Sequence, residues 1–534
     1  MNFIRQKIGS NKKIVFSIII LFIVMLGIAN RFIQDDAFIS FRYAENLLNG
    51  TGLSWNTGAD NRVEGYTNFL WVIVIAGIMF AGLDPVLWSH VIGLIIGVGT
   101  LFYTFKLALL YSRSEFIALL TLLLVGTNYS FISYMTGGLE TQLQTLLFVV
   151  STYGIFRIIM NQAYTNWIFL TGVSIIFSLA ILTRPDSLII VGILYIFFVR
   201  NVFEQQKNEL KSALLWLTLP SVLIVGLWVV FKINYYGAIL PNTYYVKATG
   251  NSLEILFRGL LYLWIFFREY SFVVFIILSI LLIKQILVNR YDYALGVIVL
   301  LWFIYIIKIG GDFMEFRMFV PILPFCMIII SKILFFIAEW KIRLSLLLLL
   351  LISSLSHAIL FREAYGIESI QMLQAHVTKE DENWKKVGIV LGELFSQSKE
   401  PVWIATTAAG AIPYYSKLPT IDMLGLNDRW VAKNGIEFSS RPGHTRTITL
   451  EYLLESKVNL VLGPPRVRLR TVSSTRNPQV FFLSTIKESL LPANTRIIEI
   501  PLDDMHKIEI LYLVQHDFID HILKKMNFNT YTIQ

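Results

Sequence analysis

Long apolar runs separated by short polar links fill the first two thirds of the chain. The first run is too long for a secretion signal and has no small-residue cleavage site, so we interpret it as a retained anchor. A membrane-spanning helix needs about 20 apolar residues, and several runs are shorter, so we expect about 11 to 13 transmembrane helices. The candidate runs are 14–33, 69–83, 86–111, 115–134, 139–157, 166–183, 187–200, 212–235, 270–288, 293–309, 318–338 and 344–361.

The pattern changes at about residue 363. Polar residues become common, Gly, Pro and Asn turns appear, and residues 381–395 follow the helical period. We therefore divide the chain into a transmembrane part, 1–362, and a small C-terminal α/β domain, 363–534. The chain lacks the two halves with matching interrupted segments that an inverted-repeat transporter usually has. The β-prone runs of the second part are "PVWIATT" (401–407), "VNLVLG" (458–463), "TRIIEI" (495–500) and "KIEILYLV" (507–514).

The composition excludes a soluble globular protein, because 55% of the 534 residues are hydrophobic and only 15% are charged. The net charge of +9 does not indicate a nucleic-acid partner, since much of the Lys and Arg lies in short links between apolar runs. Such links mark the cytoplasmic side of a membrane protein. The basic residues in question are Arg5, Lys7, Lys12, Lys13, Arg200, Lys207, Lys211, Lys284, Arg290, Lys341 and Arg343.

This orientation places a set of polar segments on the outer side. They are 34–68, 136–142, 182–187, 235–247, 310–317 and everything beyond residue 361. Twelve crossings would bring the chain back to the side on which it starts, whereas this orientation puts its two ends on opposite sides. One crossing within 69–134 must therefore be split, re-entrant or missed. The single cysteine, Cys326, permits no disulfide within the chain.

The first outer segment contains two adjacent carboxylates, Asp35 and Asp36. In "DDAFISFRYAENLLNG" (35–50) the apolar residues follow helical spacing and Asn-Gly closes the run, which predicts an amphipathic helix along the membrane surface. In a structural interpretation, one carboxylate caps the helix and the other interacts favourably with the positive end of the helix dipole. In a chemical interpretation, one is a general base, because a carboxylate at a helix N-terminus stays ionised. Adjacent helical residues point about 100° apart, so the two do not share one task.

Further polar residues fall on the same predicted side. Each of them also has a structural interpretation, as a helix cap, as part of the interfacial aromatic belt or as a marker of topology. As a group they indicate a functional site, because charged residues near membrane helices more often have a function than not. Arg and Lys suit a phosphate, and Asn and aromatic side chains suit a sugar, so we expect a lipid-phosphate-sugar substrate. The residues are Arg42, Arg62, Glu64, Tyr66, Asn68, Glu140, Arg184, Asp186, Asn242, Tyr244, Lys247, Asp312 and Arg317.

An ordered set of motifs runs through both parts of the chain. It comprises "DDAFISFRYAENLLNGTGLSWNTG", "RVEGYTNFLW", "TGGLET", "LTRPDS", "YYGAILPNTYYVK", "GGDFMEFRMFVPILP", "TTAAGAIPYYSKLPTIDMLGLND" and "RPGHTR". This set resembles membrane-embedded glycosyltransferases of the GT-C superfamily. The likeness is greatest to the mycobacterial terminal β-(1→2)-arabinofuranosyltransferase type and its bacterial relatives.

The resemblance implies an inverting transfer of a sugar, for example a pentose such as arabinofuranose, from a polyprenyl-phosphate donor. The acceptor would be a cell-envelope glycan, glycolipid or glycoprotein. An Asp of the first loop is the implied base, either Asp36 or Asp35, with Asp36 preferred. Cavity cations would hold the donor phosphate, and the segment with Asn427, Asp428 and His444 would close over the site. The implied location is the bacterial cytoplasmic membrane, with the C-terminal domain on the periplasmic side and membrane lipids around the bundle.

Two functions of other classes stay open. A transporter or flippase of a lipid-linked glycan would need ionisable residues at mid-membrane, whereas these carboxylates gather at one face. A non-catalytic protein that binds an envelope polymer would tolerate loss of the first-loop carboxylates. No cofactor is indicated with certainty. A divalent cation held by carboxylates alone is compatible with the sequence.

Overall fold

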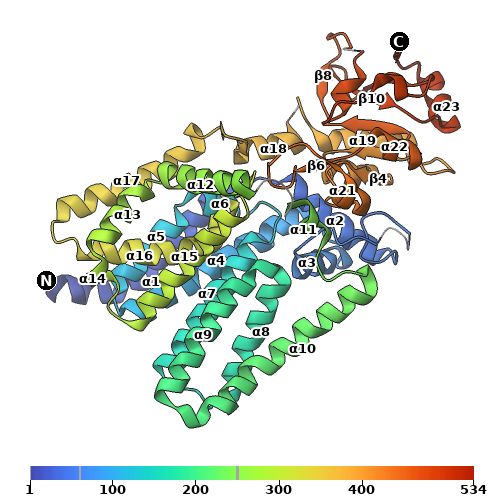
Figure 1. The fold of residues 1–534 in the computed structure, drawn as a ribbon. Coiled ribbons are helices and arrows are strands. Elements are labelled where there is room, and N and C mark those ends of the chain that lie inside the picture. The colour runs from blue at the N-terminus through green and yellow to red at the C-terminus, as the bar shows by residue number, and fades with distance from the viewer. Residues whose placement is uncertain (1, 59–61, 248–251, 380, 475, 534) are drawn as a thin grey trace.

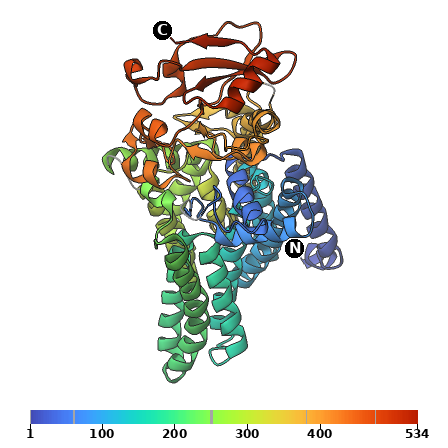
Figure 2. The same cartoon turned by 90° about the vertical axis from the view of Figure 1, so that its right-hand side faces the viewer.

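The computed structural model describes residues 2–58, 62–247, 252–379, 381–474 and 476–533, with only the backbone of residues 2–13 and Lys247. Helices form a long bundle, and a part that contains a β-sheet stands on one end of it (Figure 1). In Figure 2 the sheet lies at the top, and the teal and green helices extend away from it. The predicted change of character after the last apolar run therefore corresponds to a change of architecture.

Within the described residues, seven helices are long and apolar enough to cross a membrane, or eight if the pair bent by 92° is one span. The bent pair is α12 (Ser252–Glu269) and α13 (Phe272–Leu281). The expected 11 to 13 crossings are reached only if the four shorter apolar helices also cross. The other bundle helices are α1 (Asn2–Ala29), α3 (Phe69–Phe80), α4 (Pro85–Ser112), α5 (Glu115–Gly126), α6 (Tyr129–Ser133), α7 (Thr141–Met160), α8 (Trp167–Thr183), α9 (Leu188–Gln205), α10 (Leu210–Tyr236), α11 (Asn242–Lys247), α14 (Ile283–Ile286), α15 (Arg290–Lys308), α16 (Leu323–Phe336) and α17 (Trp340–Leu360).

Two stretches of the bundle differ from the sequence prediction. The run 115–134 is divided into α5 and α6, because Asn128 caps a new helix by accepting from the amide of Phe131. This break lies in the region where a split crossing was expected. Helix α12 was not predicted, since charged residues interrupt its apolar pattern. Its exposed apolar residues, Leu253, Leu256, Phe257, Leu260 and Trp264, nevertheless form one stripe at helical spacing.

The first-loop helix, α2 (Asp35–Leu48), differs from the expected surface helix. Its N-cap is Gln34, so Asp35 and Asp36 occupy the first turn and neither is the capping residue. The helix ends at Asn49, as the Asn-Gly pair predicts. Most of α2 between Asp35 and Ala44 is buried, because the helix packs between α3 and α20 (Ala411–Ser416) of the second part of the chain. A sequence window shows amphipathicity, but it does not show that distant segments cover the polar face as well.

The C-terminal part contains a seven-stranded sheet with the order β11-β9-β10-β7-β3-β4, and β8 pairs with β10. The four β-prone runs form β3, β7, β9 and β10, as predicted. β3 is parallel to both β4 and β7, and the remaining pairs are antiparallel. The strands are β3 (Ile404–Thr406), β4 (Thr420–Asp422), β7 (Leu460–Gly463), β8 (Val467–Leu469), β9 (Arg496–Pro501), β10 (His506–Tyr512) and β11 (Thr530–Thr532).

Helices cover both faces of this sheet. Successive residues of a strand point to opposite faces, and accordingly Leu460 belongs to one core and Val461 to the other. The first core contains α19 (Trp384–Phe395) and α23 (Asp517–Met526), and the second contains α21 (Arg429–Asn434) and α22 (Leu450–Glu455). The remaining elements are β1 (Glu363–Ala364), β2 (Ile367–Glu368), α18 (Ile370–Thr378), β5 (Ile436–Glu437) and β6 (Arg446–Thr447), with short 3-10 turns η2 (Pro185–Ser187), η3 (Lys207–Glu209), η4 (Arg317–Ile322), η5 (Pro478–Phe481) and η6 (Glu488–Leu490).

Candidate active site

A cleft of about 720 Å³ lies beside the N-terminal end of α2, where the first loop meets the sheet domain. The loops that follow the parallel strands β3, β4 and β7 contribute to its wall through Thr407 and Ala409, Leu424 and Leu426, and residues 464–468. Ligands of α/β sheets bind beyond the carboxyl ends of parallel strands. The sheet therefore presents its binding edge to Asp35 and Asp36, which line the opposite wall.

Asp35 joins the two parts of the chain. Its Oδ1 accepts a hydrogen bond from the amide of Ala411 at 2.7 Å, and its Oδ2 accepts one from the amide of Gly410 at 3.0 Å. A Cβ at position 410 would lie 1.9 Å from the Asp35 carbonyl oxygen, so only glycine allows this approach. Burial raises the pKa of Asp35 to about 7, although the two amide hydrogen bonds oppose the shift. Both carboxylate oxygens are thus engaged in holding the loop after β3.

Asp36 differs from its neighbour in environment. It is only partly buried and lines the cleft, one helical step of about 100° from Asp35. Its negative charge helps to raise the pKa of Asp35. It also lies near enough to Arg317 for the two opposite charges to attract. The two carboxylates therefore differ in burial and in partners.

A buried ionic network links three of the predicted outer segments. Arg184 donates to Glu140 at 2.9 Å and to Asp186 at 2.7 Å. Asn68 donates to the second oxygen of Glu140 at 2.9 Å and to Ser40 of α2 at 3.1 Å. The structure thus brings together four residues that the sequence singled out, and it connects them to the helix of Asp35 and Asp36.

Arg317 and Asp312 form a second buried ion pair, with 2.7 Å between Arg317 Nη2 and Asp312 Oδ2. The loop that carries them has positive φ at Gly310 (80°), Gly311 (74°) and Phe316 (47°). Positive φ is strained for a bulky residue such as Phe, and strain of this kind concentrates at functional sites. Arg317 also lies near enough to Glu140 for their charges to attract, so this loop and the network act electrostatically as one cluster.

Two residues that sequence reasoning missed hold this loop. Glu315 Oε1 lies 2.9 Å from His357 Nε2 on α17, and Glu315 Oε2 accepts from the amide of Ile370 at 2.8 Å. Glu315 is inside the quoted motif "GGDFMEFR", but no local pattern relates it to a histidine 42 residues later. The pair fixes the chain immediately before the strained Phe316.

Several predicted binding residues instead join protein segments to one another. The Arg42 guanidinium donates to the carbonyl oxygens of Trp55, Pro413 and Leu418. Asn242 donates to the carbonyl of Gly425 at 2.7 Å, and Asn427 donates to Asp422 at 3.1 Å. The other members of this group are Glu64 (paired with Lys232 at 2.8 Å), Tyr66 (3.0 Å from Tyr236) and Asp428 (the N-cap of α21). Arg42 thus joins the first loop to the sheet domain and Asn242 joins α11 to it, whereas Glu64 and Tyr66 join the first loop to α10.

The remaining predicted residues lie apart from the ionic cluster. Arg62 stacks over the ring of Tyr235 at 4.6 Å, and Tyr244 is 50% exposed. The side chain of Lys247 lies outside the described residues. His444 lines the cleft and packs against Phe313, and burial lowers its pKa to about 4, which keeps the imidazole neutral near pH 7.

The cleft also contains an ionic group that the sequence did not suggest. His376 stacks on Trp384 with 4.6 Å between ring centroids, and it pairs with Glu368 and Glu382. Burial alone would lower the pKa of His376, but these two carboxylates raise it to about 10, so the ring is charged. Arg441 binds the other side of Glu368 at 2.6 Å.

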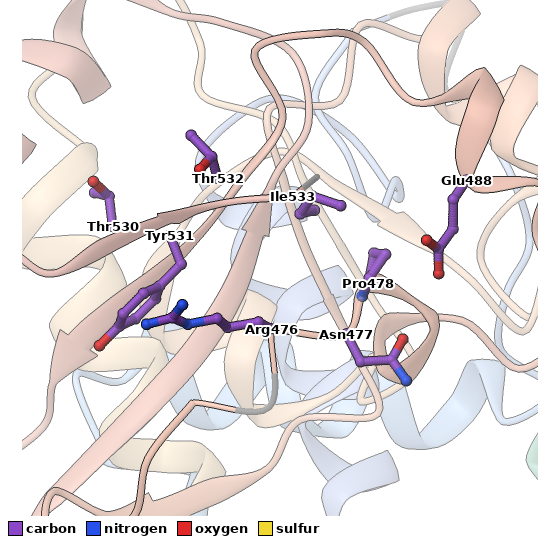
Figure 3. Close-up of a pocket in the computed structure, with 8 residues that line it drawn as sticks. All are labelled: Arg476, Asn477, Pro478, Glu488, Thr530, Tyr531, Thr532 and Ile533. Atoms are coloured by element: carbon purple, nitrogen blue, oxygen red, sulfur yellow. The ribbon is translucent and has the colours of Figure 1, made fainter.

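A second cavity, of about 580 Å³, lies at the outer end of the sheet domain. Figure 3 shows Arg476 beside the ring of Tyr531, with Asn477 and Glu488 on the other side of the hollow. None of the predicted residues lines it, and Asp35 and Asp36 belong to the other cavity. We therefore assign the chemistry to the cleft beside α2. Among the described residues, no three His, Cys, Asp or Glu side chains gather closely enough to bind a metal ion.

One segment of the chain matches a family model, and the fold matches solved structures. A family model described as a domain of unknown function, DUF8728, matches residues 371–517. No curated protein sequence matches the chain.

The crystal structure of ArnT from Cupriavidus metallidurans bound to undecaprenyl phosphate superposes with a TM-score of 0.57 and 11% sequence identity. The apo state of the same protein gives a TM-score of 0.55. Each comparison covers 94% of this chain and 98% of that chain. At this identity the likeness concerns the fold, which confirms the predicted architecture: a polytopic helical bundle of the GT-C type with a C-terminal α/β domain.

Proposed function

We propose that the chain is an integral membrane glycosyltransferase that uses a polyprenyl-phosphate-linked sugar. The observation that carries the proposal is the cleft between Asp36 and the carboxyl ends of β3, β4 and β7. A partly buried carboxylate, the carboxyl ends of parallel strands and the cations Arg441, Arg466 and Arg468 line this one cleft. The shared fold with ArnT, whose crystal structure contains undecaprenyl phosphate, supports a donor of this class.

In this proposal Asp36 is the general base. The first turn of α2 stabilises its negative charge, and partial exposure gives a hydroxyl access to it. The acceptor O–H gives its proton to Asp36, and the acceptor oxygen forms a bond to the anomeric carbon. The bond between that carbon and the donor phosphate oxygen breaks from the opposite face, so the configuration inverts.

The leaving group gains a second negative charge as this bond breaks. Arg317 lies near enough to the proposed base for their opposite charges to attract, and Arg184 of the adjoining network lies near enough to Arg317 for the two like charges to repel. Guanidinium groups bind phosphate in a bidentate manner. We therefore assign binding of the polyprenyl phosphate to Arg317, with Arg184 as its support. Asp35 positions the loop after β3.

The finer features of the proposal concern substrate and orientation. The donor sugar of the arabinofuranosyltransferase-like type would be a pentose, and the acceptor an envelope glycan, glycolipid or glycoprotein. The positive links 200–211 and 341–343 would face the cytoplasm, which puts the cleft and the residues from 363 onward on the periplasmic side of the bacterial cytoplasmic membrane. Membrane lipids surround the bundle.

A deletion strain tests this function whichever sugar the donor carries. We expect lipid extracts of the deletion strain to accumulate a polyprenyl-phosphate sugar, and its envelope to lose the same sugar, relative to the parent. Re-expression of the wild-type gene should restore both. A flippase would instead leave lipid-linked glycan on the cytoplasmic leaflet, and a binding protein would change neither pool. Either result would contradict the proposal.

A further inference from the structure

The outer wall of the cleft carries arginines at alternating positions. Arg466 and Arg468 line the cleft, and Arg470 continues the series beyond β8. Alternate residues of a strand share one face and lie about 6.6 Å apart. Consistent with this alternation, the intervening Val467 packs on the core formed with α19 and α23. The sequence "PPRVRLR" thus becomes a row of positive charge.

Part of this charge is not neutralised by the protein. Within the described part of the chain, Arg466 is exposed and makes no hydrogen bond or ion pair. Arg468 lies 3.8 Å from Glu509, a distance at the limit of an ion pair. Two acids of the cleft, Glu368 and Glu382, are already engaged by His376 and Arg441.

The cleft is therefore polarised. Its inner end holds Asp35 and Asp36, and its outer wall holds Arg466 and Arg468. Asp381, which also lines the cleft, lies 3.9 Å from the exposed Lys379. Figure 1 shows β8 near the top of the sheet domain, farther from the helix bundle than β4. A molecule that spans the cleft thus touches the base at one end and arginines on the water-exposed side at the other.

We propose that this outer wall is an acceptor-docking site for an anionic glycan. Phosphate or carboxylate groups of the glycan bind Arg466 and Arg468, while a hydroxyl of the same molecule reaches Asp36. The inference rests on the proposed function, since it names the acceptor of that reaction. Guanidinium groups match both anions geometrically. The distance of β8 from the bundle favours a water-soluble polymer over the headgroup of a membrane lipid.

Binding to defined polymers tests the proposal without an activity assay. The full chain in phosphatidylcholine nanodiscs is titrated with hyaluronan oligosaccharides (carboxylate), poly(glycerol phosphate) (phosphodiester) and neutral dextran of matched length. We expect at least one anionic polymer to bind at least tenfold tighter than dextran. The tighter one identifies the recognised group. Loss of one charged hydrogen bond weakens binding by roughly tenfold, so we expect a loss of at least that size in the double variant R466Q/R468Q.

Matched variants isolate the site. R476Q removes an arginine that lines the other cavity, so it should bind as the wild type does. R466K/R468K should recover part of the affinity, because it restores positive charge at both positions, and R466Q/R468Q should keep the unfolding temperature of the wild type. The proposal is overturned if dextran binds as tightly as both anionic polymers, if R466Q/R468Q binds like the wild type, or if R476Q loses as much as the double variant.

Discussion

The hydrogen bonds of Asp35 predict a measurable opening between the first loop and the sheet. In Asp35→Ala the amides of Gly410 and Ala411 lose their acceptors inside a buried contact. An unsatisfied buried donor costs about 1–3 kcal/mol. Two of them should therefore weaken this contact by about 2–6 kcal/mol. This corresponds to an increase of roughly 30-fold or more in local opening.

Hydrogen exchange followed by mass spectrometry measures this opening directly. The protein in nanodiscs is labelled near pH 6, and the peptide over 404–416 is followed in the wild type, Asp35→Ala and Asp36→Ala. We expect faster exchange in Asp35→Ala alone, because the amides of Gly410 and Ala411 donate to Asp35. Equal exchange in all three proteins would refute the assignment of Asp35 as the residue that holds the loop after β3.

Three further predictions follow from the same geometry. Arg317→Ala should weaken binding of undecaprenyl phosphate, measured by titration, and should destabilise the protein by about 3–5 kcal/mol, because Asp312 is left buried without its partner; unchanged lipid affinity would contradict the phosphate assignment. Glu315→Gln should lower transfer activity at least tenfold while polymer binding in the cleft stays intact, because only the Arg317 loop shifts; full activity would exclude a positioning role. The stability of the wild type is compared with that of Asp35→Asn, which does not titrate. The advantage of the wild type should be greatest near pH 4 and should fall as pH rises through about 7, because the folded state raises the pKa of Asp35 above its unfolded value. A difference in unfolding temperature that stays constant between pH 4 and 8 would show that burial does not shift the pKa of Asp35.

Local patterns predict much of this molecule. Apolar runs locate most of the bundle helices, with α12 as an exception, and the β-prone runs locate four strands of the sheet, since both signals lie within short windows. The grouping of Glu140, Arg184 and Asp186 also follows from the sequence, because topology alone places the ends of their helices on one side of the membrane. Asp35, Asp36, Arg317 and His444 were also anticipated, because each lies in a predicted outer segment.

Contacts between distant segments could not be predicted in this way. The burial of α2 depends on α20, which lies more than 360 residues later. The pairing of Glu315 with His357 and the stacking of His376 on Trp384 depend on how the loop 310–317 and α18 pack, and no periodicity encodes that. For the same reason the sequence did not show that Arg42 and Asn242, polar residues of two predicted outer segments, donate hydrogen bonds to carbonyl groups of the sheet domain.

The role of Asp36 is the central claim, and one comparison tests it most directly. Wild type and Asp36→Asn, reconstituted in the same nanodiscs, are incubated with polyprenyl-phosphate sugars extracted from the deletion strain and with its envelope fraction, and sugar loss from the lipid is followed over time. Removal of a general base should slow this loss by at least about 100-fold, while undecaprenyl phosphate binding and the unfolding temperature stay the same. Transfer by Asp36→Asn at the wild-type rate would contradict the account.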